Sequence, residues 1–150
     1  MSTPTVTCTS GGKPTYIYKL VSHTSPTPDA VEGLPERLPV SSIDQSSGFL
    51  HFSTAKQVPN TLKHFFGADS HVYILRIPYD RVEKDIKWED PKAEVCGPRG
   101  GEGVFPHLYN GLKLGKEEVE SVRVLYRRAD GDEGGGWDAA LRESADWLNY

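Results

Sequence analysis

The chain has 150 residues, of which 37% are hydrophobic and 25% are charged, and its formal net charge is −4. This length fits one domain and excludes two ordinary ones. The 17 basic residues are scattered along the chain. This scatter argues against a nucleic-acid partner, while a small anionic ligand stays compatible with the charge.

Segments that target or anchor a protein are not expected here. No stretch approaches the roughly 18 apolar residues of a membrane span, and residues 1–15 lack the basic and apolar regions of a signal peptide. Cys8 and Cys96 are too few for a disulfide framework, which favours a reducing compartment. We therefore expect a cytoplasmic protein without a membrane partner.

Composition predicts three parts. Residues 1–14 are rich in Ser, Thr, Gly and Pro and are expected to form a disordered tail. Residues 15–129 are expected to form a single α+β domain. Residues 130–150 are expected to hold a Gly-rich linker and a short amphipathic helix.

The first strand is expected at residues 16–22, because YIYKLVS is β-branched and aromatic and contains no breaker. Side chains alternate along a strand, so Lys19 shares a face with Ile17 and Val21. The next 22 residues contain four prolines and are expected to form a long connection, which can cover a cleft.

A second strand is expected within GFLHFS, at residues 48–53, and the main helix of the chain after it. Thr54 and Gln57 match a capping box, although Pro59 indicates that the helix begins closer to itself. The apolar residues expected on the buried face of this helix are Val58, Leu62, Phe65 and Phe66.

Three further strands are expected. The apolar run at 71–77 is typical of a central strand buried on both faces. A short strand is expected at 86–88, and a last one at 119–127. Between these two lie a Gly/Pro-rich loop and the apolar block VFPHLY.

Two histidines stand within apolar, aromatic runs: His51 in FLHFST and His107 in VFPHLY. Buried imidazoles often serve only as structural hydrogen-bond partners, but their pKa also suits acid–base chemistry. In a strand, His51 shares a face with Phe49 and Ser53, beside the free amides of a helix N-terminus that suit a phosphate or a carboxylate.

Two further roles, metal ligand and pocket wall, are chemically open to residues of these blocks. His51 and His107 with a nearby glutamate can supply three ligands, but no H-x-x-H, H-E-x-x-H or C-x-x-C spacing supports this, so no metal is expected. Trp88 and Glu89 form either a simple edge-strand pair or the aromatic wall and carboxylate of a pocket.

Four blocks, YIYKLV, SSIDQSSGFLHFSTAKQVPNTLKHFF, IKWE and FPHLYNGL, together resemble the domain of unknown function 952 family over roughly residues 16–126. That family is distantly similar in fold to ADP-ribosyltransferases. The resemblance implies an α+β protein with a small split antiparallel sheet around a cleft, one main helix after the second strand, and NAD as the candidate cofactor.

The resemblance also implies roles for particular residues. Tyr18 and Lys19 would lie near the nicotinamide ribose, and His51 or Phe52 would replace the aromatic residue beside the nicotinamide ring. His107 stands where such transferases commonly carry a glutamate that activates the acceptor. Glu89, Glu94 and Glu102 are the candidate substitutes for that glutamate.

The function expected from these patterns is a cleft that binds a nucleotide-like or other anionic small molecule, with transferase activity on NAD or a related nucleotide. The expected catalytic residues are His51, His107 and Glu89. The expected ligand-binding residues are Tyr18, Lys19, Phe52, Ser53, Thr54, Trp88 and Tyr109. The alternative is a non-catalytic module with structural histidines, whose C-terminal tryptophans mark a partner or homodimer surface.

Overall fold

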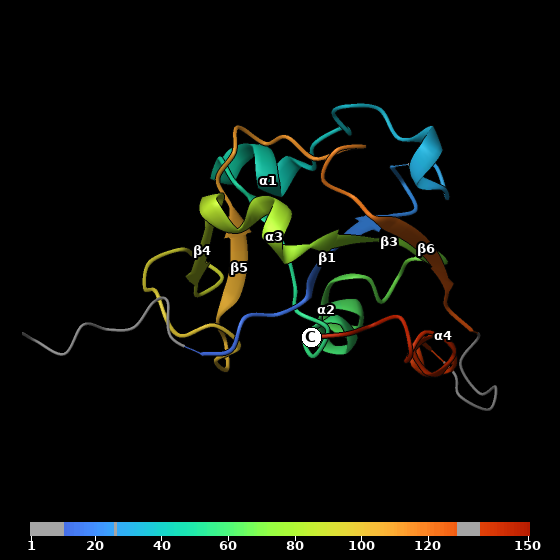
Figure 1. Cartoon of the computed structure of the whole chain (residues 1–150). Coiled ribbons are helices and arrows are strands. Elements are labelled where there is room, and N and C mark those ends of the chain that lie inside the picture. The colour runs from blue at the N-terminus through green and yellow to red at the C-terminus, as the bar shows by residue number, and fades with distance from the viewer. Residues whose placement is uncertain (1–10, 26, 129–135) are drawn as a thin grey trace, which may run out of the picture.

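The computed structural model describes residues 11–25, 27–128 and 136–150. It has the mixed class that the sequence predicts, with small antiparallel sheets and few helices (Figure 1). In chain order the elements are β1 (Tyr16–Ser22), η1 (Val31–Gly33), α1 (Ser42–Ser47), β2 (Leu50–His51), α2 (Val58–Phe65), β3 (His71–Pro78), α3 (Tyr79–Val82), η2 (Glu83–Asp85), β4 (Ile86–Glu89), β5 (Phe105–Leu108), β6 (Ser121–Tyr126) and α4 (Asp138–Glu143).

The strands form two antiparallel sheets of three strands each. One sheet has the order β1-β3-β6 and the other the order β2-β5-β4, so β3 and β5 are central. Tyr18 and Ser53 join the sheets through two backbone hydrogen bonds of 2.8 and 2.9 Å. This bridge brings the end of β2 against β1 and so places β1 beside the β2-β5-β4 sheet.

Strand β3, at the centre of the β1-β3-β6 sheet, has buried residues on both of its faces, as its apolar run predicts. Val72 and Ile74 pack with side chains of α2 and α4, which lie on the same side of this sheet (Figure 1). Leu75 and Ile77 pack into a second cluster that also contains Leu50 from β2. The second cluster therefore lies between the two sheets and fixes β2 relative to β1.

Helix α2 is the main helix expected after the second strand, but it begins later than the capping box indicates. The Gln57 side chain does accept a hydrogen bond of 2.9 Å from the Thr54 amide, and the helix then runs from Val58. Val58 and Leu62 are fully buried, whereas Phe65 is 77% exposed. The prediction that Phe65 lies on the buried face is wrong, because the helix ends at this residue and its side chain extends beyond the core.

The C-terminal segment packs on the β1-β3-β6 sheet. Trp137 and Ala140 are buried in the same cluster as Tyr18, and Trp147 packs edge-on against the Tyr18 ring with centroids 5.5 Å apart. The expected linker begins at 130 and falls mostly outside the described residues, as does the part of the expected tail from 1 to 10.

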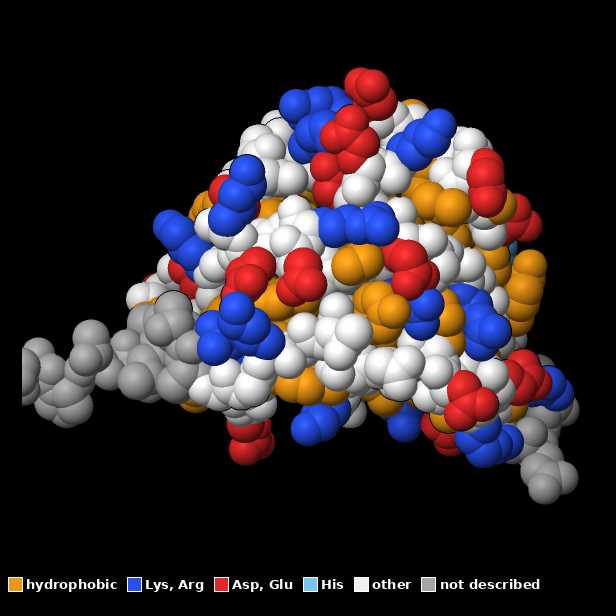
Figure 2. Space-filling view, in the orientation of Figure 1, with side chains coloured by type: hydrophobic (Ala, Val, Ile, Leu, Met, Phe, Trp, Pro, Cys, Tyr) orange, Lys and Arg blue, Asp and Glu red, His pale blue; other side chains and the backbone are white. Residues whose placement is uncertain are grey.

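The described surface carries both signs of charge. Figure 2 shows Lys and Arg side chains interspersed with Asp and Glu over one face, without a large area of one sign. No helix within the described ranges is both long enough and apolar enough to cross a membrane.

Candidate functional site

The two histidines singled out from the sequence come together. His51 is the last residue of β2, and its cross-strand partner on β5 is His107. Their ring centroids are 5.1 Å apart, with the ring planes at 63°. Residues opposite each other in an antiparallel pair project from the same face, so the register of β2 and β5 creates this pair.

Asp44 holds the His51 ring. Its Oδ1 atom is 2.6 Å from His51 Nδ1 and also accepts a 3.1 Å hydrogen bond from the His51 amide. Asp44 lies in α1, which the Ser41 side chain caps by accepting a hydrogen bond from the Asp44 amide. Gly48 ends this helix in the left-handed conformation, with φ of 82°, and the chain returns directly into β2.

Lys19 completes this group from the neighbouring sheet. Its Nζ atom is 2.6 Å from Asp44 Oδ2 and 3.0 Å from the His51 carbonyl oxygen. As predicted, Lys19 lies on the face of β1 that carries Ile17, towards the core between the sheets. The Asp44 side chain is only 1% exposed, so the ion pair is shielded from solvent.

The charges of this buried group affect one another. Burial by itself raises the pKa of Asp44, but the hydrogen bond from His51 and the charge of Lys19 outweigh it and lower that pKa to about 2. Burial lowers the pKa of Lys19, and Asp44 opposes this shift. Asp44 is therefore a fixed negative charge behind the His51 ring.

His107 has its own carboxylate. Its Nδ1 atom is 3.0 Å from Glu89 Oε1, and the Tyr109 hydroxyl donates a 2.5 Å hydrogen bond to the same oxygen. Burial lowers the pKa of His107, and the hydrogen bond to Glu89 opposes the shift only in part. Burial and Glu89 both raise the pKa of Tyr109, so its hydroxyl stays protonated.

Phe49 packs among the rings of this site. Its centroid lies 4.5 Å from that of His51, 4.4 Å from that of His107 and 4.9 Å from that of Tyr109. His51 is 25% exposed, whereas His107 is 1% exposed. The site therefore presents one imidazole to solvent and keeps the other beneath an aromatic cover.

The Nδ1 atom of each imidazole faces a carboxylate, and Nε2 of neither ring has a hydrogen-bond partner among the described residues. A carboxylate on Nδ1 favours the tautomer whose Nε2 carries the free lone pair. Such an imidazole can accept a proton or bind a ligand at Nε2. His51, the more exposed ring, is the better placed to do so.

Tyr18 and Trp88 lie away from this group. Tyr18 faces the C-terminal segment, where its hydroxyl bonds to the Trp147 carbonyl and the Asn149 amide, because neighbouring residues on β1 point to opposite faces. Trp88 is buried in the core between the sheets, and its Nε1 atom donates a 3.0 Å hydrogen bond to the Tyr79 hydroxyl. The structure therefore does not bring these two residues to the histidine pair.

Three other predicted ligand-binding residues are also buried. Phe52 packs in the core between the sheets. The Ser53 hydroxyl is 3.1 Å from the Thr61 hydroxyl of α2, and the Thr54 amide is bonded to Gln57. Of the predicted ligand-binding residues, only Lys19 and Tyr109 join the histidines.

Other candidates from the sequence lie at the surface or are bonded elsewhere. Glu94 and Glu102 are exposed in the loop between β4 and β5. In the part of the chain that the structure describes, no group of three His, Cys, Asp or Glu side chains can hold a metal. Cys96 is disulfide-bonded. Disulfides are rare in reducing compartments, so this bond does not support the reducing compartment expected from the low cysteine count, and the cytoplasmic location stays a prediction.

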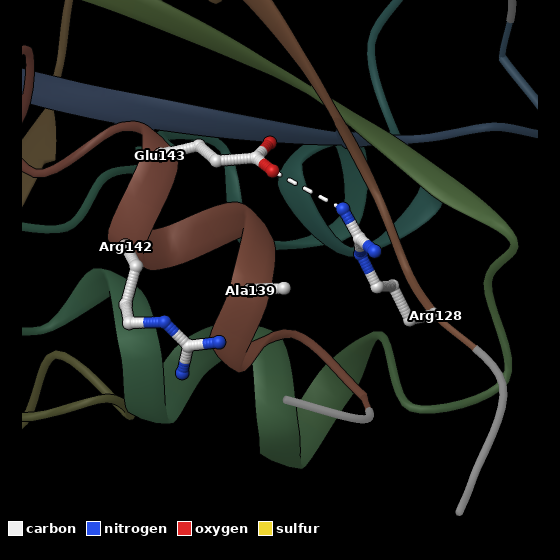
Figure 3. A pocket seen from close by; sticks show the side chains of 4 residues that line it. All are labelled: Arg128, Ala139, Arg142 and Glu143. Carbon is white, nitrogen blue, oxygen red and sulfur yellow. Dashed lines mark hydrogen bonds and ion pairs between the residues drawn. The ribbon is translucent and has the colours of Figure 1, made fainter. Parts of the chain in front are cut away.

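Three hollows open elsewhere on the described surface, and neither histidine of the pair lines them. One of about 420 Å³ lies beside α4, where Arg128 pairs with Glu143 and where Ala139 and Arg142 complete the lining (Figure 3). A second adjoins it along β6. The third, of about 360 Å³, lies beside β4 and includes Glu89 among its lining residues.

Sequence reasoning missed Asp44 and Phe49. Asp44 sits in the polar run SSIDQSS, which is typical of an exposed turn. The available signal was Lys19, whose place between Ile17 and Val21 on an apolar face requires a buried anion as partner. Phe49 was placed on the face of His51, but its contact with His107 depends on the pairing of β2 with β5.

The fold and the site define a small α+β protein with two antiparallel sheets and a paired carboxylate–histidine arrangement. The chain belongs to the family described as "Protein of unknown function (DUF952)", whose model matches residues 26–122. This confirms the family that the sequence blocks resemble. No curated protein matches the chain.

Solved structures of CC0527 from Caulobacter crescentus match the fold. The crystal structure is 31% identical, covers 78% of this chain and 91% of its own, and has a TM-score of 0.57. The solution NMR structure is 32% identical, with the same TM-score and coverage of 78% and 90%. These matches do not extend the resemblance to ADP-ribosyltransferases.

Proposed function

We propose that the pair of His51 and His107 forms a binding site for a small anionic molecule, and that His51 exchanges a proton with it. The observation that carries this proposal is the 2.6 Å contact between His51 Nδ1 and Asp44 Oδ1 on a ring that solvent reaches. A fixed carboxylate behind an imidazole orients the ring and selects the tautomer in which Nε2 is free to bind a ligand or to exchange a proton with it.

Several groups around the pair support an anionic, nucleotide-like ligand. Lys87 is exposed, and its Nζ atom lies 4.5 Å from the Tyr109 ring centroid, so it supplies positive charge at the edge of the site. The half-exposed ring of Tyr109 offers a surface for a flat group. Lys19 has a different role from the one expected, since it acts on Asp44 and not on the ligand.

The reaction proposed for this site is group transfer: water or an acceptor hydroxyl forms a bond to the bound molecule as the bond to its leaving group breaks. His51 takes the proton from the attacking hydroxyl as general base, or gives one to the leaving group as general acid. Glu89 is the glutamate that the site provides, and it acts through His107 and Tyr109. NAD and related nucleotides are the first candidate ligands, because the family resembles ADP-ribosyltransferases distantly in fold. The competing hypothesis is a non-catalytic module that binds a protein partner or a second copy of this chain.

A thermal-shift and NMR screen tests the proposal. The probes are NAD, ADP-ribose, AMP and inorganic phosphate, added to the wild type, to His51→Gln and to the matched control His64→Gln on the exposed side of α2. We expect stabilisation of the wild type and of His64→Gln, its loss in His51→Gln, and a ligand-dependent shift of the His51 ring nitrogens.

The screen can also overturn the proposal. If no probe stabilises the wild type or moves the His51 resonances, the histidines are structural. The same conclusion follows if His51→Gln responds to every probe as the wild type does.

A further inference from the structure

The hollow beside β4 lies against Glu89 but not against His51 or His107. Its volume of about 360 Å³ is within the range of small-molecule sites, and an apolar cavity of about 150 Å³ already holds benzene. Tyr79, Ile86 and Trp88 provide apolar walls. A ring the size of benzene therefore fits this space.

Most polar groups that line this hollow already have partners. Glu83 forms a 2.7 Å ion pair with Lys13, and Arg99 donates a 3.1 Å hydrogen bond from Nε to the Gly11 carbonyl. Lys87 lies over the Tyr109 ring. Each charged group at the rim therefore already interacts with another part of the protein.

Glu89 differs from them. Its Oε1 atom accepts the hydrogen bonds of both His107 and Tyr109, whereas Oε2 has no partner among the described residues. The side chain is 13% exposed, and Oε2 is not among the buried polar atoms that lack a partner, so solvent reaches this oxygen. A carboxylate on the wall of a hollow is a strong acceptor for the donor of a bound molecule, because hydrogen bonds to a charged acceptor are stronger than neutral ones.

We propose that the hollow beside β4 binds a small molecule with a ring and a hydroxyl or amino donor, that the donor bonds to Glu89 Oε2, and that occupancy is transmitted to His107 through the same carboxylate. The ring packs on Ile86 and Trp88, and the donor reaches Glu89. Because Glu89 also holds His107 Nδ1, any change in its position changes the hydrogen bond of that imidazole. This site does not depend on the anion proposed at His51.

Three probes of similar shape, tested on the wild type, separate the contribution of the ring to binding from that of the hydrogen-bond donor. Benzyl alcohol offers a ring and a donor, toluene offers the ring alone, and benzoate offers the ring with an anionic acceptor. We expect benzyl alcohol to bind about tenfold more tightly than toluene, which is the effect of one hydrogen bond to a charged group. Benzoate is expected to bind more weakly than both, because its charge meets Glu89.

The binding is followed through the indole N–H signals and the ring nitrogens of the histidines. Benzyl alcohol is expected to move the signals of Trp88 and His107 and to leave those of Trp137 and His64 in place. In Glu89→Gln the preference for the alcohol over toluene falls to within about twofold, because an amide accepts more weakly than a carboxylate. His64→Gln, on the exposed side of α2, is expected to bind benzyl alcohol as the wild type does.

Two results would overturn the proposal. If benzoate binds best and Arg99→Ala abolishes its binding, the hollow takes anions through its basic rim. If none of the three probes moves the Trp88 signal in the wild type, the hollow is not a binding site. Neither result bears on whether nucleotides act at His51. That question is decided by the response of His51→Gln to NAD, ADP-ribose, AMP and phosphate.

Discussion

His107 is buried beside the more exposed His51, and the two rings are direct cross-strand partners with centroids 5.1 Å apart. Each ring has a separate carboxylate, Asp44 from α1 or Glu89 from β4. Charge on His51 adds to the effect of burial in lowering the pKa of His107. Two adjacent imidazoles in such different environments can take different roles in acid–base chemistry.

The ion pair of Lys19 and Asp44 predicts a large loss of stability when either charge is removed. Lys19→Met and Asp44→Asn should each lower the free energy of unfolding by about 3–5 kcal/mol, because each leaves one buried group unpaired. Denaturation in urea measures this loss. The double variant should lose clearly less than the sum of the two single losses.

The matched control for this prediction is the ion pair of Arg128 and Glu143, whose side chains are 51% and 68% exposed (Figure 3). Arg128→Ala should cost less than about 1 kcal/mol, because solvent screens exposed charges. Equal losses at the buried and exposed pairs would show that Lys19 and Asp44 do not form a shielded pair in solution.

Asp44 also predicts how stability depends on acid pH. Its pKa is about 2 in the folded chain against an ordinary value of 3.8, so the unfolded chain takes up the proton first as the pH falls. The contribution of Asp44 is complete above about pH 5 and is lost between about pH 4 and pH 2. The loss is about 2 kcal/mol by linkage.

Urea denaturation at a series of pH values measures this dependence. In Asp44→Asn the slope between pH 4 and pH 2 should be shallower than in the wild type. The exposed Asp29→Asn serves as the control and should keep the wild-type slope. An unchanged slope in Asp44→Asn would mean that the low pKa of Asp44 is absent in solution.

Particular residues show how far the sequence determines this structure. The run YIYKLVS predicted strand β1 within its observed bounds, because its β-branched and aromatic side chains leave no competing local structure. GFLHFS is also apolar and aromatic and was expected to form a strand, yet only Leu50 and His51 form strand β2. Its length depends on pairing with β5, which lies more than 50 residues away and leaves no local pattern.

The candidate site was predicted where the residue type itself carried the signal. The chemistry of the imidazole singles out His51 and His107, the family resemblance adds Glu89 as a candidate, and the β2-β5-β4 sheet brings the three together. The resemblance placed Tyr18 with Lys19, but Tyr18 points to the opposite face of its sheet and bonds to the C-terminal segment. Asp44 was missed because its burial arises only when α1 folds back against β2, a tertiary contact that no local pattern records.

The burial of His107 predicts that this imidazole stays neutral at pH 7. Its pKa is lowered from 6.5, so it should take up a proton only below that value, as followed by an NMR titration of the ring nitrogens. The stability linked to neutral His107 is complete above pH 6.5 and is lost as the pH falls through the lowered pKa.

Glu89→Gln provides the second half of this test. The hydrogen bond from Glu89 raises the pKa of His107 against the effect of burial, so its removal should lower that pKa further. Titration of His107 above pH 6.5 in the wild type would show that the ring is more open to solvent than the structure indicates.

The hydroxyl of Tyr18 predicts how firmly the C-terminal segment is held on the sheet. It donates a 2.9 Å hydrogen bond to the Trp147 carbonyl and accepts one of 2.7 Å from the Asn149 amide. Tyr18→Phe keeps the packed ring but leaves both backbone groups without this partner. The free energy of unfolding should fall by about 1–3 kcal/mol.

Hydrogen exchange locates this effect in the chain. In Tyr18→Phe the Asn149 amide should exchange faster than in the wild type, while the amides of β3 should change only by the overall loss of stability. Tyr126→Phe is the control, because Tyr126 is 64% exposed. If the Asn149 amide keeps its protection in Tyr18→Phe, then the packing of Trp137 and Trp147 is sufficient to hold the segment without the hydroxyl.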